Sequence, residues 1–171
     1  MTQYPKTLVS RFFDETAKTY DTVSNWATFG RDRYWKKEIL NKIDRPSSVL
    51  DLGCGTGILT RIIALKFPQS KIVGLEISKS YLKIAEKKSF PNISFIHEDA
   101  EKMNLDCKFD YICSSYIPKY CNPKILVKRC IKHLNLNGCI ILHDFAYPKN
   151  FLVKIFWRLF FVLLNFFGII R

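Results

Sequence analysis

Five short apolar runs alternate with helical stretches over the middle of the chain, and this alternation restricts the fold more than any other feature. The apolar runs are bounded by Pro, Gly, Asn or Asp and have the length of single buried strands. Strands are predicted at 48–52, 71–75, 93–96, 109–113 and 139–142, and helices with apolar spacing near 3.6 at 58–67, 79–88 and 123–134. This order predicts an α/β fold with a doubly wound, mostly parallel sheet, whose ligand crevice lies at the carboxyl ends of the strands.

Two flanks lie outside this alternation. Residues 1–46 have a helical pattern that breaks near Gly30, and we expect them to form a helical lid. Residues 47–148 are the predicted α/β core, and 149–171 are predicted to form an apolar, basic helix. Because the 171 residues exceed the roughly 150 of a typical domain only slightly, all three parts are expected to belong to one domain.

A glycine-rich turn joins the first predicted strand to the first helix of the core. Its glycines, Gly53, Gly55 and Gly57, allow a ligand to approach the backbone closely, and the following helix start offers free N–H groups. The spacing G-x-G-x-G differs from the dinucleotide pattern G-x-G-x-x-G. In addition, Asp51 precedes the first glycine by two positions, where a carboxylate repels a pyrophosphate. A ligand with an ammonium and a sulfonium group fits better, and S-adenosylmethionine is such a ligand.

Acidic residues follow the next two predicted strands. Glu76 ends the second strand, 19 residues beyond Gly57, where a carboxylate can accept hydrogen bonds from both ribose hydroxyls. Asp99 and Ala100 follow the third strand, where a side-chain acceptor and a backbone N–H can bind an adenine edge. Together with the glycine turn, these residues predict one site for one ligand.

The residues before the core carry a more specific pattern. Residues 13–21 follow F-D-x-x-A-x-x-Y-D, and Asn25, Gly30, Arg33 and Trp35 come after them. This pattern resembles the class I methyltransferases, and more closely the family that C-methylates the quinone ring in ubiquinone and menaquinone biosynthesis.

The likeness extends through 95–101 and 109–110 as far as 144–148, and so covers most of the chain. It implies a Rossmann-like fold and S-adenosylmethionine-dependent C-methylation of a quinone or quinol precursor, such as a demethylmenaquinone-like molecule. By this resemblance the cofactor-binding residues include Thr60, Glu76, Asp99, Ala100 and Ser115.

The chain departs from this family in two places. After the fourth strand the family usually reads F-G-[LIV]-R-N, whereas here Lys119 replaces the arginine and Tyr120 the asparagine. Because Arg and Lys are not equivalent in bidentate binding, another small molecule or a lipid remains open as the methyl acceptor. The C-terminal antiparallel hairpin of such folds is also expected to be missing. This leaves open a truncated, non-catalytic cofactor-binding remnant, and pairing of the fifth strand with a second copy or a partner chain.

Methylation of a ring carbon depends mainly on orientation of the two reactants, which contributes up to roughly 7–11 kcal/mol. A base that removes the proton of an adjacent phenol should add about 10²–10⁴-fold. Tyr20, Lys119, Tyr120 and His143 are candidates by position, but the sequence does not identify the base, so no catalytic residue is assigned. Tyr20 and Lys119 are predicted to bind the substrate.

The formal net charge of +12 should attract the protein to nucleic acid or to anionic lipid. Nucleic acid is disfavoured, because the sequence contains no RNA-binding module.

Residues 151–170 combine a wide apolar face with Lys154 and Arg158, one helical turn apart. Their uncharged run, 159–170, is shorter than the roughly 20 residues needed to span a bilayer. Two interpretations stay open: a helix lying in a membrane interface, or one packing across the edge of the sheet.

The six cysteines include no C-x-x-C pair, so no metal site is predicted. Reduced thiols fit a cytoplasmic protein, peripheral to the inner face of the membrane if the last helix lies in its interface.

Overall fold

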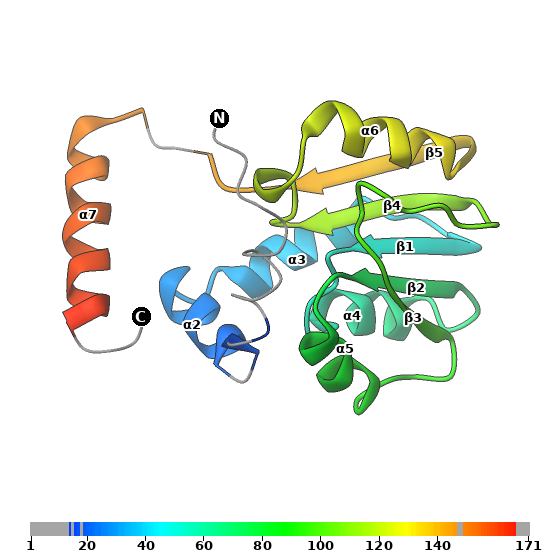
Figure 1. Cartoon of the computed structure of the whole chain (residues 1–171), viewed down its shortest axis with the longest axis horizontal. Helices are drawn as coiled ribbons and strands as arrows, with labels where there is room; N and C mark the ends of the chain where they lie inside the picture. Colours follow the sequence, from blue (N-terminus) through cyan, green and yellow to red (C-terminus); the bar gives the residue numbers. More distant parts are fainter. Residues whose placement is uncertain (1–13, 15, 18, 147–148, 167–171) are drawn as a thin grey trace.

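The computed structural model describes residues 14, 16–17, 19–146 and 149–166, and a five-stranded sheet forms its centre (Figure 1). The strands lie in the order β3-β2-β1-β4-β5, and every neighbouring pair is parallel. Their bounds are β1 (Ser48–Leu52), β2 (Lys71–Glu76), β3 (Ile93–His97), β4 (Phe109–Ser115) and β5 (Leu134–His143). The predicted doubly wound sheet is therefore confirmed, and its winding reverses between β1 and β4.

Helices cover both faces of this sheet. The described part of the chain forms α2 (Tyr20–Ala27), α3 (Asp32–Asn41), α4 (Ile58–Lys66), α5 (Lys79–Glu86), α6 (Pro123–Lys132) and α7 (Phe151–Phe166). Of these, α3 and α4 pack on one face of the sheet and α6 on the other. Consecutive strand residues point to opposite faces. Val49 therefore packs with Ile39 of α3 and Ile63 of α4, whereas Leu50 packs with Leu126 of α6. Both clusters are almost fully buried, which fixes β1 at the centre of the fold.

The start of the last strand differs from the prediction. It was expected at residue 139, because Asn137 and Gly138 are typical of a turn, yet β5 begins at Leu134. Leu134 pairs with Phe109 and Cys139 with Tyr111, so the extra residues of β5 form a bulge. Asn137 has a φ of 63° within it. The asparagine and glycine therefore bend the strand rather than end it.

The helical N-terminal segment breaks where the sequence predicts. Gly30 has a φ of 74° in the short turn between α2 and α3. The division into a lid at 1–46, a core at 47–148 and a helix at 149–171 stays a prediction, and residues 1–13 lie outside the described part of the chain.

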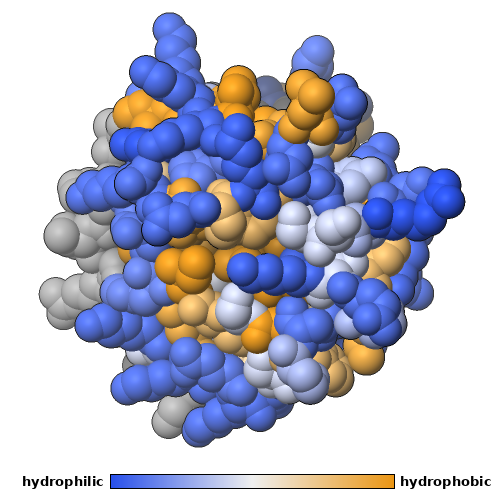
Figure 2. Space-filling model, turned by 90° about the vertical axis from the view of Figure 1, so that its right-hand side faces the viewer, coloured by the Kyte–Doolittle hydropathy of each residue, from blue (hydrophilic) through white to orange (hydrophobic). Residues whose placement is uncertain are grey.

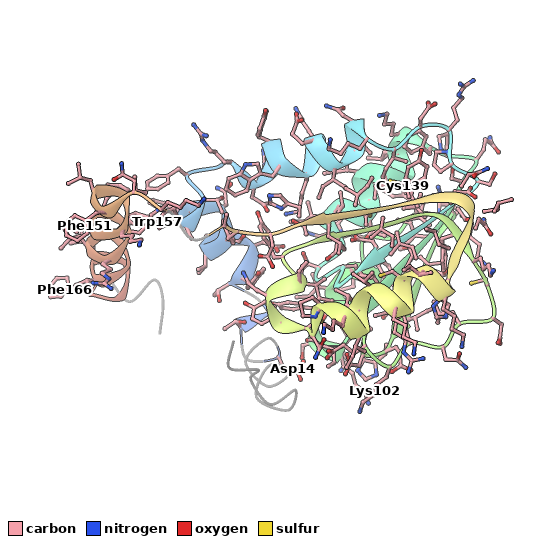
Figure 3. The ribbon with its side chains drawn as sticks, turned by 90° about the horizontal axis from the view of Figure 1, so that it is seen from above. Asp14, Lys102, Cys139, Phe151, Trp157 and Phe166 are labelled. Atoms are coloured by element: carbon pink, nitrogen blue, oxygen red, sulfur yellow. The ribbon has the colours of Figure 1, made fainter. Side chains whose placement is uncertain are left out.

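The last helix stands apart from the sheet. Figure 1 shows α7 on the far side of α2, and Figure 3 shows Trp157 on the side of α7 that faces the rest of the molecule. The ring of Phe29 lies 4.7 Å from that of Phe160 and 6.4 Å from that of Trp157, measured between centroids. Among the described residues, no helix combines the length and apolar character needed to cross a bilayer.

The opposite end of the molecule, at the amino ends of the strands, has a different surface. Figure 2 shows hydrophilic side chains around apolar ones on this face. The site described next lies at the other end of the strands, on the side of α2.

Candidate functional site

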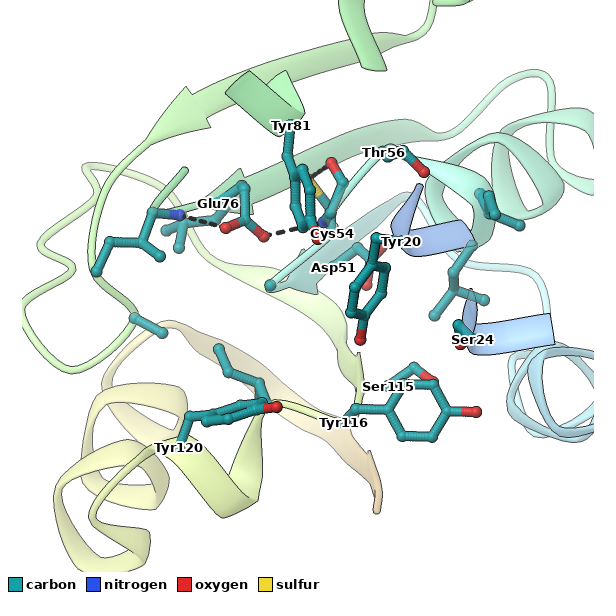
Figure 4. Close-up of a pocket in the computed structure, with 18 of the residues that line it drawn as sticks. Tyr20, Ser24, Asp51, Cys54, Thr56, Glu76, Tyr81, Ser115, Tyr116 and Tyr120 are labelled. Carbon is teal, nitrogen blue, oxygen red and sulfur yellow. Dashed lines mark hydrogen bonds between the residues drawn. The ribbon is translucent and has the colours of Figure 1, made fainter. Parts of the chain in front are cut away.

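A cavity lies at the carboxyl ends of the central strands, where the winding of the sheet reverses (Figure 4). Asp51 of β1, Glu76 at the end of β2 and Ser115 at the end of β4 all line it. The parallel strands bring these three residues together, although they are far apart in the sequence. Of the predicted cofactor residues, those that line the cavity are Asp51, Gly53, Gly55, Glu76, Asp99, Ala100 and Ser115.

The glycine turn brings backbone close to this cavity. Gly53 and Gly55 have φ values of 64° and 56°, which L side chains rarely adopt. A Cβ on Gly53 would also lie only 3.1 Å from Cδ1 of Ile117. The backbone N–H groups of Gly53 and Cys54 both donate to the Leu75 carbonyl, at 2.7 and 3.0 Å, and so attach the turn to β2. The backbone of the turn therefore favours glycine at both positions, and its hydrogen bonds to Leu75 fix it in place.

The carboxylate of Asp51 is 1% exposed, and the Thr60 hydroxyl donates to its Oδ2 at 2.7 Å. Burial raises the pKa of this carboxyl to about 7, while the Thr60 bond and the charge of Lys36 oppose the shift. A cation bound beside Asp51 would compensate the buried charge.

Glu76 is held by backbone N–H groups. Gly55 donates to its Oε2 at 3.0 Å, and Ile77 and Ser78 both donate to its Oε1 at 2.9 Å. Burial raises the pKa of this carboxyl and the three bonds oppose that rise. Since a carboxylate offers about four acceptor positions, one position remains for a ligand hydroxyl.

The loop after β3 contributes the next wall. Glu98, Asp99 and Ala100 line the cavity, and Ala100 is 3% exposed. The Oδ1 atom of Asp99 accepts the Glu101 N–H at 3.0 Å, which orders the loop. On the opposite wall, the buried Oγ of Ser115 has no hydrogen-bond partner among the described residues. Such a buried polar atom is normally satisfied, so a ligand hydrogen bond is expected there.

Three predicted residues do not line the cavity. Gly57 is the N-cap of α4, with a φ of 79°. Thr60 faces Asp51 and so contacts the cavity only through that carboxylate. Lys119 lies outside: its N–H donates to Oδ2 of Asp144 at 2.7 Å and its Nζ is 4.9 Å from the ring centroid of Phe145. Their assigned roles in direct ligand binding are therefore not supported by their positions.

The N-terminal segment closes the cavity. Tyr20, predicted as a substrate residue, does line it, and Figure 4 places its ring between Tyr81 and Tyr116. The Thr56 hydroxyl of the glycine turn donates to Oδ2 of Asp21 at 2.8 Å. The Ser78 hydroxyl donates to Oδ1 of Asp14 at 2.6 Å, which lowers the pKa of that carboxyl. These two bonds attach the segment to the cofactor side of the cavity.

Sequence reasoning missed a polar group in the wall of the cavity. Asp32, Lys36 and Tyr116 line it, and the Tyr116 hydroxyl donates to Oδ1 of Asp32 at 2.9 Å. Lys36 forms an ion pair with the same oxygen. The i,i+4 spacing of Asp32 and Lys36 was a possible signal, but nothing local indicates that Tyr116, 84 residues away, completes the group.

Comparisons with known proteins identify the fold and the family. The DhpI–SAM–HEP complex superimposes with a TM-score of 0.71 at 16% identity, over 90% of this chain and 73% of that chain. This likeness shows the fold alone, a five-stranded parallel sheet flanked by helices. A family model described as "methyltransferase domain" matches residues 49–138. The chain therefore belongs to the methyltransferase domain family, as its resemblance to class I methyltransferases predicts.

Two relatives illustrate the range within this family. The demethylmenaquinone methyltransferase of Chlorobaculum tepidum is 30% identical over 90% of this chain and 66% of its own length. The malonyl-[acyl-carrier protein] O-methyltransferase of Halalkalibacterium halodurans is 39% identical over 85% of this chain and 57% of its own length. The chain thus spans somewhat less than two thirds of the length of these relatives.

Proposed function

We propose that the chain is an S-adenosylmethionine-dependent methyltransferase that methylates a ring carbon of a quinol. The buried carboxylate of Asp51 beside the glycine turn carries this proposal, because it favours a cationic methyl donor over a phosphorylated coenzyme. The family match and the demethylmenaquinone methyltransferase relative support it. Tyrosine rings on the acceptor side support an aromatic acceptor.

The residues of the cavity fit this cofactor. We assign Asp51 to its ammonium group and the remaining acceptor position of Glu76 to a ribose hydroxyl. Asp99 and Ala100 are assigned to the adenine, and Ser115 to a polar group of the cofactor through its unpartnered Oγ. Gly53 and Gly55 allow the backbone to approach it, while Thr60 and Gly57 act indirectly by holding Asp51 and starting α4.

When bound, the cofactor supplies a methyl group on a sulfonium, which a nucleophilic carbon can take in line. The chain contributes by orientation: Tyr20, Tyr116 and Tyr120 line the cavity, and we assign them to the acceptor. Burial raises the pKa of both Tyr20 and Tyr120, so these phenols stay protonated at neutral pH and position the acceptor rather than deprotonate it.

Calorimetric titration with S-adenosylhomocysteine tests the cofactor site, and a methyl-transfer assay tests the acceptor. The acceptors to compare are 1,4-naphthohydroquinone, simple phenols, a malonyl thioester and a phospholipid. Transfer to the naphthohydroquinone ring is expected. Transfer to the thioester carboxylate instead would favour the activity named for the other relative. No heat at millimolar S-adenosylhomocysteine would refute the cofactor site and, with it, the enzyme.

We also propose that α7 attaches the protein to the inner face of a membrane, where a polyprenyl quinol resides. Its exposed side chains are mainly apolar: Phe151 is 71% exposed and Phe166 83%. Lys154 and Arg158 add positive charge, and the helix contains no acidic residue. This combination is typical of helices that lie in the interface of anionic membranes.

A second contact is proposed at β5, one of the two outer strands of the described sheet. Leu136 on this strand is 93% exposed. An open strand edge can pair with another chain. Light scattering at several protein concentrations tests this, since a second copy pairing there would double the mass.

A further inference from the structure

We propose that Asp32 is a catalytic base, which takes the proton of an acceptor hydroxyl while Tyr116 and Lys36 hold it in place. This inference rests on the proposed methyl transfer to a quinol or phenol ring. It assigns a role to three side chains that line the same cavity, Asp32, Lys36 and Tyr116.

The three side chains form one connected group in the wall of the cavity. Asp32, Lys36 and Tyr116 are 7%, 8% and 6% exposed. Oδ1 of Asp32 accepts both the Tyr116 hydroxyl, at 2.9 Å, and the Lys36 ammonium. The Thr28 hydroxyl accepts the Asp32 N–H at 3.2 Å and fixes the start of α3. Because both of these side-chain bonds are made to Oδ1 and Asp32 lines the cavity, we assign Oδ2 as the oxygen that accepts the ligand proton.

The backbone at Tyr116 is strained in order to make this group. Tyr116 has a φ of 76°, which is uncommon for a bulky residue and is costly. Its ring stacks on Phe145 with a centroid distance of 4.8 Å and an interplanar angle of 9°. Lys36 Nζ lies 5.4 Å from the ring centroid. The surroundings thus hold the Tyr116 hydroxyl on Asp32 despite the strain, as is common at functional sites.

Asp32 fits the role better than the candidates predicted from the sequence. Tyr20 and Tyr120 have raised pKa values and stay protonated. Lys119 and His143 do not line the cavity. Asp32 lies in its wall, beside a cation that can stabilise the negative oxygen formed on the acceptor.

The proposed step balances as follows. The acceptor hydroxyl gives its proton to Asp32, and the negative oxygen raises the electron density of the ring. The ring carbon bonds to the methyl carbon, and the electron pair of the broken carbon–sulfur bond stays on sulfur. The same ring carbon then releases its own proton to water, which restores the aromatic ring, and Asp32 returns its proton to the oxygen. One proton is released overall, and Lys36 stabilises the oxyanion.

Binding of two probes to the cofactor-free protein tests whether Asp32 contacts the acceptor hydroxyl, and it needs no turnover. The probes are 1-naphthol and 1-methylnaphthalene, which differ in one hydroxyl, with protein fluorescence as the signal. The wild type should bind 1-naphthol about tenfold or more tightly than 1-methylnaphthalene, since a hydrogen bond to a charged group contributes that much. Asp32→Asn should reduce this preference, while Asp106→Asn, at an exposed position, should keep it.

Turnover tests the proton transfer. With 1,4-naphthohydroquinone, Asp32→Asn should lower kcat by about 10²–10⁴-fold. With a nitro-substituted phenol that is already ionised at the assay pH, the same variant should retain most of its rate, because no proton needs to be removed. Tyr116→Phe keeps the ring stack and should lower kcat by a smaller factor than Asp32→Asn. This loss, too, should be seen with the neutral naphthohydroquinone and be mostly absent with the ionised phenol.

The outcomes separate this inference from the proposed function. An equal loss with ionised and neutral acceptors, or an unchanged hydroxyl preference in Asp32→Asn, overturns the base while leaving the methyltransferase intact. If Asp32→Asn does not fold, judged by S-adenosylhomocysteine binding, the result for Tyr116→Phe decides. Wild-type protein that binds S-adenosylhomocysteine but methylates only a carboxylate overturns both the quinol acceptor and the base.

Discussion

Asp51 owes its chemistry to its surroundings. Its carboxylate is buried with one hydroxyl donor, Thr60, and burial raises its pKa to about 7. The Thr60 bond and the charge of Lys36 offset only part of the cost of burying this charge, and a cation bound beside Asp51 would offset more. This is why the residue favours an ammonium-bearing ligand.

Replacing this carboxylate gives the first prediction. Asp51→Asn should weaken S-adenosylhomocysteine binding by about 10- to 100-fold, because a hydrogen bond to a charged group is lost and a neutral one remains. Calorimetry measures the change, and Asp106→Asn serves as the exposed control. Equal affinities of Asp51→Asn and wild type would contradict the assignment of Asp51 to the ammonium group.

The raised pKa of Asp51 gives the second prediction. At pH 6 this carboxyl is mostly protonated in the free protein, since its pKa is about 7. A bound ammonium favours the ionised form, so binding should release close to one proton at pH 6 and much less at pH 8. Affinity should therefore fall as the pH drops below 7. Titrations in two buffers of different ionisation enthalpy measure the release, and in Asp51→Asn it should disappear.

Residue type and local spacing were sufficient to predict several of the residues that line the cavity. Asp51, Glu76, Asp99 and Ala100 stand at strand ends, and all line the cavity. Lys119 was predicted to bind the substrate from its position after a strand end, but it does not line the cavity, and its Nζ lies 4.0 Å from Oδ1 of Asp144. Side-chain direction after a strand end depends on the local backbone, which spacing does not specify.

At the scale of elements, the turn between β1 and α4 decides the shape of the site. Its positive φ values place the backbone of Gly53 and Gly55 at the cavity, and hydrogen bonds to Leu75 attach it to β2. A strand-turn-helix pattern with glycines at these positions is readable from sequence. The attachment of the turn to its neighbours is not.

A pair of glycine substitutions gives the third prediction. Gly55→Ala should lower the free energy of unfolding by about 1–2 kcal/mol, because the Cβ of an alanine with the left-handed backbone of Gly55 comes too close to the following carbonyl oxygen. Gly53→Ala should cost more, because its Cβ would also lie 3.1 Å from Ile117, whereas at Gly55 the nearest atom is 3.8 Å away. Urea denaturation of the two variants measures the difference. Equal losses would show that the Ile117 contact relaxes freely.

At the scale of the whole molecule, the described chain has two unlike ends. The cavity lies at the carboxyl ends of the strands, and α7 stands beyond the same ends (Figures 1 and 4). The amino ends present hydrophilic side chains around apolar ones (Figure 2). The rings of α7 reach the fold at Phe29, in the turn that joins α2 to α3. The proposed membrane contact would therefore lie on the side of α2 and α3.

Vesicle binding gives the fourth prediction. The protein should co-sediment with phosphatidylglycerol vesicles more strongly than with phosphatidylcholine vesicles, because the helix combines apolar and positive side chains. Leu159→Asp, at a position 60% exposed on α7, should weaken binding severalfold. Leu136→Asp, 93% exposed on β5, should not. Equal effects of the two variants would rule out α7 as the contact.

The sequence alone determined the alternation of strands and helices, the glycine turn, the acids at the strand ends and the family, because each of these depends on residues close together in the chain. Only the tertiary structure decided that Asp21 and Asp14 bond to Thr56 and Ser78, and that Tyr116 joins Asp32 and Lys36 in the wall of the cavity. Such contacts link residues more than 30 positions apart, and they form only when the sheet and its helices pack.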